Sequence, residues 1–152
     1  MKTAFISFVL ILLQIPSYAS QEAILQPHEV QIAVDAGSHF GNVILEVNTR
    51  KENAAIKISG IRLNVQNEWK EVPEKAFIDL ENPRLNQLQI RTESGRDGTP
   101  WLYIYFELFK KDELGQFNLH HIHICYHKDR FESRSIDRET KPGEFQSESI
   151  EL

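Results

Sequence analysis

Two neighbouring stretches decide the fold: Trp101–Phe109, which reads WLYIYFELF, and Phe117–His127, which reads FNLHHIHICYH. Both are rich in β-branched and aromatic residues, and their side chains alternate with a period of two, as in a β-strand. The segment Lys110–Gly115 (KKDELG) between them has the polar residues and the glycine of a turn. The sequence therefore predicts an antiparallel hairpin at this place.

The first of these strands is apolar on both sides. One face would carry Leu102, Ile104, Phe106 and Leu108, and the other Trp101, Tyr103, Tyr105 and Phe109. A strand of this kind is usually central in its sheet and covered on both faces. We favour that interpretation of the aromatic row over a platform on which a ligand stacks.

Shorter runs with the same alternation precede the hairpin. They lie at 30–34, 43–47, 61–65 and 88–90, and turn residues separate them at 36–38, 82–83 and 94–100. Across Ser59–Gly60 the apolar residues change from even-numbered to odd-numbered positions, which indicates a β-bulge. No stretch predicts a long helix, although Val72–Leu80 could hold one turn with Pro73 at its start. About seven or eight strands favour an all-β fold, an antiparallel β-sandwich of immunoglobulin-like or jelly-roll type, with a small β-barrel as second choice.

The N-terminus is typical of a signal peptide over residues 1–19. Lys2 provides the positive charge, 4–13 (AFISFVLILL) is the apolar segment, and Ser17-Tyr18-Ala19 offers small residues to a signal peptidase. The apolar segment is shorter than the roughly 20 residues of a membrane-spanning helix. We therefore expect cleavage near Ala19, one domain over 20–140, and a polar C-terminal tail or edge strand over 141–152.

The cysteine count and the missing glycosylation sites bear on the compartment. Cys125 is the one cysteine, so no internal disulfide can form, and no asparagine stands in an Asn-x-Ser/Thr sequence. Small proteins secreted from animal cells usually contain several disulfides. We therefore expect a periplasmic or secreted protein, with a bacterial periplasm favoured, and no stable insertion into a membrane.

Four of the six histidines fall between positions 120 and 127. In a strand, His121 and His123 project to one face about 6.6 Å apart at the backbone, so both imidazoles could bind one metal ion. Cys125 and His127 follow on that face as possible additional ligands, and this chemistry suits Zn or Cu. Further ligands would have to come from His28, His39 or an acidic residue. We favour a simpler interpretation, in which this is the polar face of a strand whose other face is buried; a pH-responsive contact surface is a third possibility.

Cys125 lies on the same face as these histidines, although a lone cysteine is usually buried. Three explanations are open: the face is covered, a bulge near His120–His121 changes the parity, or the thiol is exposed. We favour a covered Cys125.

The function expected from this sequence is binding rather than catalysis. No Gly-x-Ser-x-Gly elbow, phosphate loop, Cys-x-x-Cys or His-Glu-x-x-His motif is present, so we expect no enzyme and no cofactor. The formal charge of −5, with scattered basic residues, argues against nucleic acid as a partner. We expect a protein partner, such as a basic toxin or hydrolase neutralised by an inhibitor or immunity-type protein. The contact loops would be Glu93–Pro100 or Lys110–Gly115.

Two other functions stay open. One is a periplasmic Zn- or Cu-binding protein that uses the histidine-rich strand at 120–127, with His121 and His123 as ligands. The other is a structural subunit of a surface assembly, which would associate through an exposed edge strand.

Overall fold

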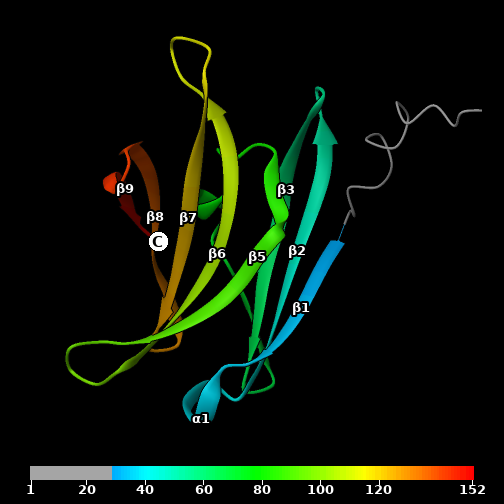
Figure 1. The fold of residues 1–152 in the computed structure, drawn as a ribbon. Helices are drawn as coiled ribbons and strands as arrows, with labels where there is room; N and C mark the ends of the chain where they lie inside the picture. The colour runs from blue at the N-terminus through cyan, green and yellow to red at the C-terminus, as the bar shows by residue number, and fades with distance from the viewer. Residues whose placement is uncertain (1–28) are drawn as a thin grey trace, which may run out of the picture.

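The computed structural model describes residues 29–152, in which the chain forms two antiparallel sheets (Figure 1). The first sheet has the strand order β1-β2-β3-β4 and the second has the order β5-β6-β7-β8-β9. Each strand pairs with its neighbours in sequence, so both sheets are meanders. The expected signal peptide at 1–19 lies outside the described residues.

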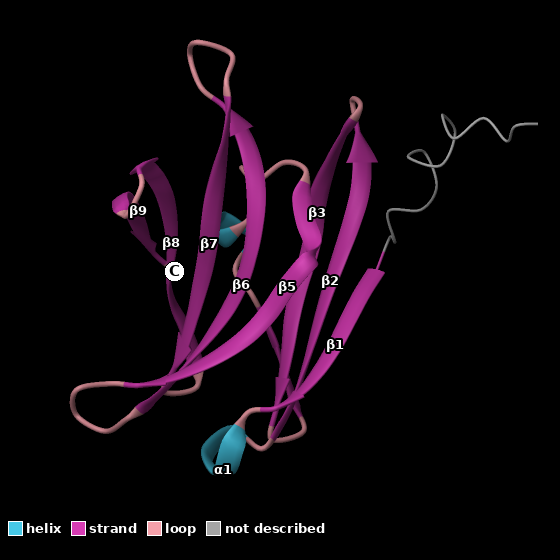
Figure 2. Cartoon of the chain, in the orientation of Figure 1, coloured by secondary structure: helices cyan, strands magenta, loops and turns pink. Residues whose placement is uncertain are grey.

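The elements are almost all strands (Figure 2). The four-stranded sheet consists of β1 (Glu29–Asp35), β2 (Asn42–Glu52), β3 (Ala55–Val65) and β4 (Glu68–Glu71). The five-stranded sheet consists of β5 (Pro83–Ser94), β6 (Pro100–Lys111), β7 (Phe117–His127), β8 (Arg130–Lys141) and β9 (Glu144–Glu151). The helical pieces are α1 (Gly37–Phe40) and the 3₁₀ helix η2 (Glu74–Ala76).

The predicted all-β sandwich is confirmed, and both sheets described are open rather than closed into a barrel. Residues 29–152 hold nine strands, where about seven or eight were expected. The expected helical turn within 72–80 is η2. The segment expected as a polar tail or edge strand contains β9, which pairs with β8. None of the helices in the described part of the chain is long and apolar enough to cross a membrane.

The core lies between the two sheets and comes from alternate residues of the central strands. The largest side chains with almost no exposure are Val43, Leu45, Val47, Ile61, Leu63, Leu102, Ile104, Phe106, Ile122, Ile124 and Tyr126. Burial of one such side chain contributes about 1.5–3 kcal/mol relative to its exposure. The hairpin predicted from 101–127 is β6–β7, and it supplies about half of this core.

The predicted bulge is confirmed in β3. Asn48 of β2 pairs with Gly60 while the next residue, Thr49, pairs with Ile58, so Ser59 is the additional residue. Because of this insertion, Ile58 and Ile61 both point into the core although three positions separate them.

One expectation about β6 differs from the structure. Its aromatic side was expected to lie beneath a further layer, but residues 29–152 form only two layers. Trp101 and Tyr103 are partly exposed and Phe109 is exposed. Tyr105 alone in this row is buried, and the neighbours that cover it belong to its own sheet.

Candidate functional site

The predicted histidines lie on the outer face of the five-stranded sheet, away from the core. His121 is opposite Glu107 of β6, and His123 is opposite Tyr105. Between the two histidines, Ile122 points inward and is fully buried. We call this surface the aromatic–histidine face and define it by Arg91, Trp101, Tyr103, Tyr105, Glu107, His121, His123 and Asp137.

A chain of hydrogen bonds crosses the middle of the aromatic–histidine face. The Tyr105 hydroxyl donates to Glu107 Oε1 at 2.8 Å and lies 2.7 Å from His121 Nδ1. Arg84 of β5 donates from Nη1 to the other carboxylate oxygen of Glu107 at 2.7 Å. Three adjacent strands therefore hold these four side chains in fixed positions.

The same contacts determine the tautomer of His121. The Tyr105 hydroxyl has one proton, and it goes to the Glu107 carboxylate. His121 Nδ1 must therefore carry a hydrogen and donate it to the phenolic oxygen. In the neutral ring this leaves the lone pair on Nε2, which can accept a hydrogen bond or bind a metal ion.

His123 has a different environment, because its Nε2 lies 3.3 Å from Asp137 Oδ2. Burial lowers the pKa of His123 below its ordinary value of 6.5, and Asp137 opposes that shift without cancelling it. The imidazole is consequently neutral at pH 7 and can act as donor and acceptor at once.

Arg91 and the aromatic rings complete this face. The Arg91 guanidinium lies 3.8 Å from the centre of the Tyr105 ring, in a cation–π contact. Trp101 and Tyr103 stack with their ring centres 6.4 Å apart. Together with 93–97, these two rings line a hollow of about 270 Å³, so one of the predicted contact loops borders the face.

His127 lies at the end of the same row, but it is only 5% exposed. Its ring stacks on Trp101 at 4.0 Å, and Nε2 lies 3.2 Å from Thr99 Oγ1. A register shift after Cys125 makes Glu132 the additional residue of β8, and its carboxylate lies 3.5 Å from His127 Nδ1. Through these contacts His127 holds the loop that contains Thr99, just before β6, against the sheet.

Cys125 is buried, as expected, with 3% of its surface exposed. Burial raises the pKa of its thiol to about 12. Since the thiolate is the form that binds metals and attacks electrophiles, Cys125 is a packing residue at neutral pH.

The structure thus separates the four residues considered as ligands. His121 and His123 reach the surface two positions apart on β7, while Cys125 and His127 are buried. Among residues 29–152, no three His, Cys, Asp or Glu side chains are arranged to hold one ion. Of the other possible suppliers, His39 lies in α1, where its ring contacts Phe40, and His28 lies outside the described residues.

Sequence reasoning missed Arg91, Glu107 and Asp137 as parts of this site. Arg91 follows the apolar Ile90 in a short run of alternating apolar and polar residues. This alternation places Arg91 on the side of the strand that faces away from the core. Which residues lie beside one another across strands depends on register, and the histidine strand alone does not contain that information.

Comparisons of the chain with protein-family models, with curated proteins and with solved structures found no match.

Proposed function

We propose that this chain is an exported binding protein whose aromatic–histidine face recognises another protein. One observation carries the proposal: tyrosine and tryptophan side chains of the interior strand β6 and an arginine of the adjacent edge strand β5 are held by mutual contacts, and no other layer of residues 29–152 covers them. Tyr, Trp and Arg are the residues most enriched at the energetic centres of protein interfaces.

The rigidity of these side chains supports the proposal. Tyr105 is held by Glu107, His121 and Arg91 before any partner arrives. Binding therefore costs little additional side-chain entropy, which otherwise amounts to about 0.5–1.5 kcal/mol for each flexible side chain that becomes ordered. The formal charge of −5 favours a basic partner, and a toxin or hydrolase neutralised in the periplasm fits that description.

The experiment is a capture assay on the extracytoplasmic fraction of the source cells. Immobilised wild-type protein should retain a partner in stoichiometric amount, and Arg91→Glu should lose it, because the substitution reverses a charge of the face and removes the cation–π contact with Tyr105. Arg50→Glu is the matched control, since Arg50 is an exposed arginine on β2 of the other sheet. Equal capture by the two variants, or no stoichiometric partner at all, contradicts the proposal.

A second candidate is Zn or Cu binding by His121 and His123. The observation in its favour is the free Nε2 of His121 beside a neutral His123. Thermal unfolding with added Zn²⁺ tests it, because a ligand at one hundred times its Kd stabilises the folded state by about 2.7 kcal/mol. His121→Gln should abolish the shift and His39→Gln should preserve it; a wild type that neither Zn²⁺ nor Cu²⁺ shifts eliminates this candidate.

A further inference from the structure

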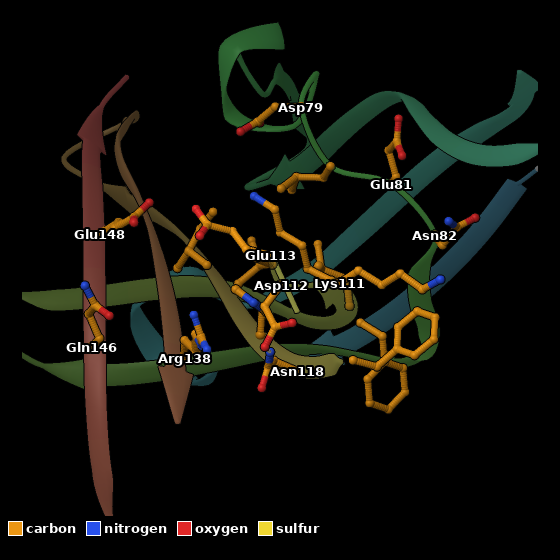
Figure 3. Close-up of a pocket in the computed structure, with 18 of the residues that line it drawn as sticks. Asp79, Glu81, Asn82, Lys111, Asp112, Glu113, Asn118, Arg138, Gln146 and Glu148 are labelled. Atoms are coloured by element: carbon orange, nitrogen blue, oxygen red, sulfur yellow. Dashed lines mark hydrogen bonds between the residues drawn. The ribbon is translucent and has the colours of Figure 1, made fainter. Parts of the chain in front are cut away.

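A second hollow lies on the opposite side of the five-stranded sheet, away from the aromatic–histidine face. It is a cleft of about 760 Å³ between the inner face of β6–β9, the segment 79–82 and the hairpin loop at 112–114 (Figure 3). None of its lining residues belongs to β1–β4, so the four-stranded sheet leaves this end of the inner face uncovered. Clefts of this size commonly hold small molecules.

The floor of the cleft contains an arginine that makes no hydrogen bond or ion pair within residues 29–152, although its charge helps to lower the pKa of Asp112. Cross-strand register places Leu108, His120, Arg138 and Gln146 in one row across β6 to β9. Arg138 Nε is buried and has no hydrogen-bond partner, and within the described residues its guanidinium makes no ion pair shorter than 4.0 Å. The Arg138 side chain as a whole is partly exposed and lines the cleft, so an anion bound there would give this guanidinium an acceptor.

Most acidic residues around the cleft already have partners. Asp79 pairs with Arg134, Glu81 with Lys57 at 3.4 Å, and Asp112 accepts the backbone N–H groups of Leu114 and Gln116. Glu148 is opposite Ile136, two positions along β8 from Arg138, and makes no ion pair with Arg138 in the structure. Lys110 adds a second positive charge. Burial first, and then the charges of Lys110 and Arg138, lower the pKa of His120 below 6.5, while Glu148 opposes the shift.

Apolar side chains also line the cleft. Leu80, Leu108 and Ile122 are almost fully buried beneath it, Ile136 is partly exposed, and Phe109, Leu114 and Phe117 are exposed at 48%, 84% and 66%. An apolar group of a ligand could therefore be buried against Ile136 and these exposed side chains.

We infer that this cleft binds a small organic carboxylate with an apolar body, and that Arg138 holds the carboxylate. The planar guanidinium matches a carboxylate in a two-pronged contact, and the neutral His120 in the adjacent position can donate a further hydrogen bond. This site is independent of the proposed protein-binding face, because the two lie on opposite sides of the sheet.

Titration calorimetry with decanoate tests the inference, with 1-decanol as the ligand that lacks the carboxylate. Wild-type protein should bind decanoate at least tenfold more tightly than decanol, and Arg138→Gln should weaken decanoate binding at least tenfold. Arg130→Gln is the matched control, because Arg130 is an exposed arginine at the start of the same strand. The side-chain amide signals of Asn118 and Gln146 should shift on binding, which locates the ligand in the cleft.

Several results would overturn the inference: no binding of decanoate at millimolar concentration, equal affinity for decanol, or full affinity in Arg138→Gln. If Arg138→Gln does not fold, Arg138→Lys keeps the charge but loses the two-pronged contact, and it should still weaken binding. The carboxylate could also be the C-terminus of a peptide. This is tested with a peptide whose last residue is apolar, once with a free C-terminus and once with an amidated C-terminus. Binding that needs the free terminus and Arg138 supports carboxylate recognition, and binding of both forms alike counts against it.

Discussion

At the scale of single residues, one phenolic hydroxyl joins the two halves of the aromatic–histidine face. Tyr105 bonds to Glu107 on its own strand and to His121 on the next. We expect Tyr105→Phe to lower the free energy of unfolding by about 1 kcal/mol, since a hydrogen bond of this kind contributes roughly that amount. The same change should let His121 redistribute its proton between Nδ1 and Nε2, which ¹⁵N spectra of the imidazole report directly.

Tyr103→Phe is the control for this substitution, because Tyr103 lies on the same strand and the same face but does not contact His121 in any of the hydrogen bonds above. The His121 spectrum should stay as in the wild type. An unchanged tautomer in Tyr105→Phe would show that the hydroxyl does not determine the state of His121.

His123 makes stability depend on pH. Burial lowers its pKa below 6.5, with Arg91 and His121 acting in the same direction and Asp137 against it. The unfolded chain then binds more protons than the folded chain near pH 6.5, so the free energy of unfolding falls as the pH drops from about 8 through 6.5 toward the folded pKa. His120, whose pKa is also lowered, adds to this slope.

We expect His123→Asn to flatten the slope when urea unfolding is compared between about pH 8 and pH 5.5. Carboxyl groups whose pKa is lowered, such as Glu46 and Asp112, titrate below this window and leave the comparison undisturbed. His39→Asn, in the exposed part of α1, should retain the wild-type slope. An identical slope in His123→Asn would exclude His123 as its source.

At the scale of elements, the bulge in β3 predicts opposite outcomes for two single-residue deletions. Deletion of Ser59 removes the additional residue and leaves Ile58 and Ile61 two positions apart, so both still face the core. The protein should fold, with a loss within the ordinary range of about 0.5–3 kcal/mol.

Deletion of Arg62 shortens the same strand by the same amount but reverses the side-chain direction of Leu63 and Val65 relative to Ile61. Both are buried, and their loss from the core costs about 1.5–3 kcal/mol each. We expect this variant to fail to fold or to melt far lower by circular dichroism. Similar stability of the two deletion variants would contradict the role of the bulge.

The elements that the sequence predicts best are those with a long alternation of apolar residues. β6, β7 and the bulge of β3 follow from local patterns, because each must bury one side. β8 is harder to recognise in the sequence, since Arg134 and Arg138 occupy positions that face inward. Glu132, the additional residue of a bulge, also interrupts the alternation of inward and outward side chains. The turn before β8 is also atypical: Lys128 and Asp129 both have positive φ, where a hairpin of this type usually has Asn-Gly.

At the scale of the whole molecule, each functional surface combines residues that are distant in the sequence. The histidine strand could be recognised by itself, but its partners Tyr105, Glu107 and Asp137 become neighbours only through the register of three strands. The cleft depends even more on assembly, because Asp79 and Arg138 line the same cleft only when the connection between the sheets packs against β8. Neither arrangement can be obtained from the spacing of residues along one strand.

The edges of the two sheets determine whether the molecule stays monomeric. The edge strands are β1, β4, β5 and β9. β4 has only four residues, and the pairing of β5 is interrupted between Arg84 and Gln89, so these two edges offer little backbone with which another strand could pair. β9 is exposed along its whole length and carries Phe145 at 56% exposure and Ile150 at 37%. It also carries three glutamates and no basic residue, so two copies of β9 would repel each other.

Glu148→Val tests this account of β9, because it removes the central charge and adds an apolar, β-branched residue. Sedimentation velocity should show a wild-type monomer from micromolar to near-millimolar concentration and a concentration-dependent dimer for the variant. Ser147→Val is the matched control, since it adds the same side chain on the opposite face and leaves all three glutamates in place. If the wild type itself dimerises at micromolar concentration, the edge is an assembly surface and the chain is better explained as a structural subunit. If neither variant associates, the glutamates are not what keeps the edge unpaired.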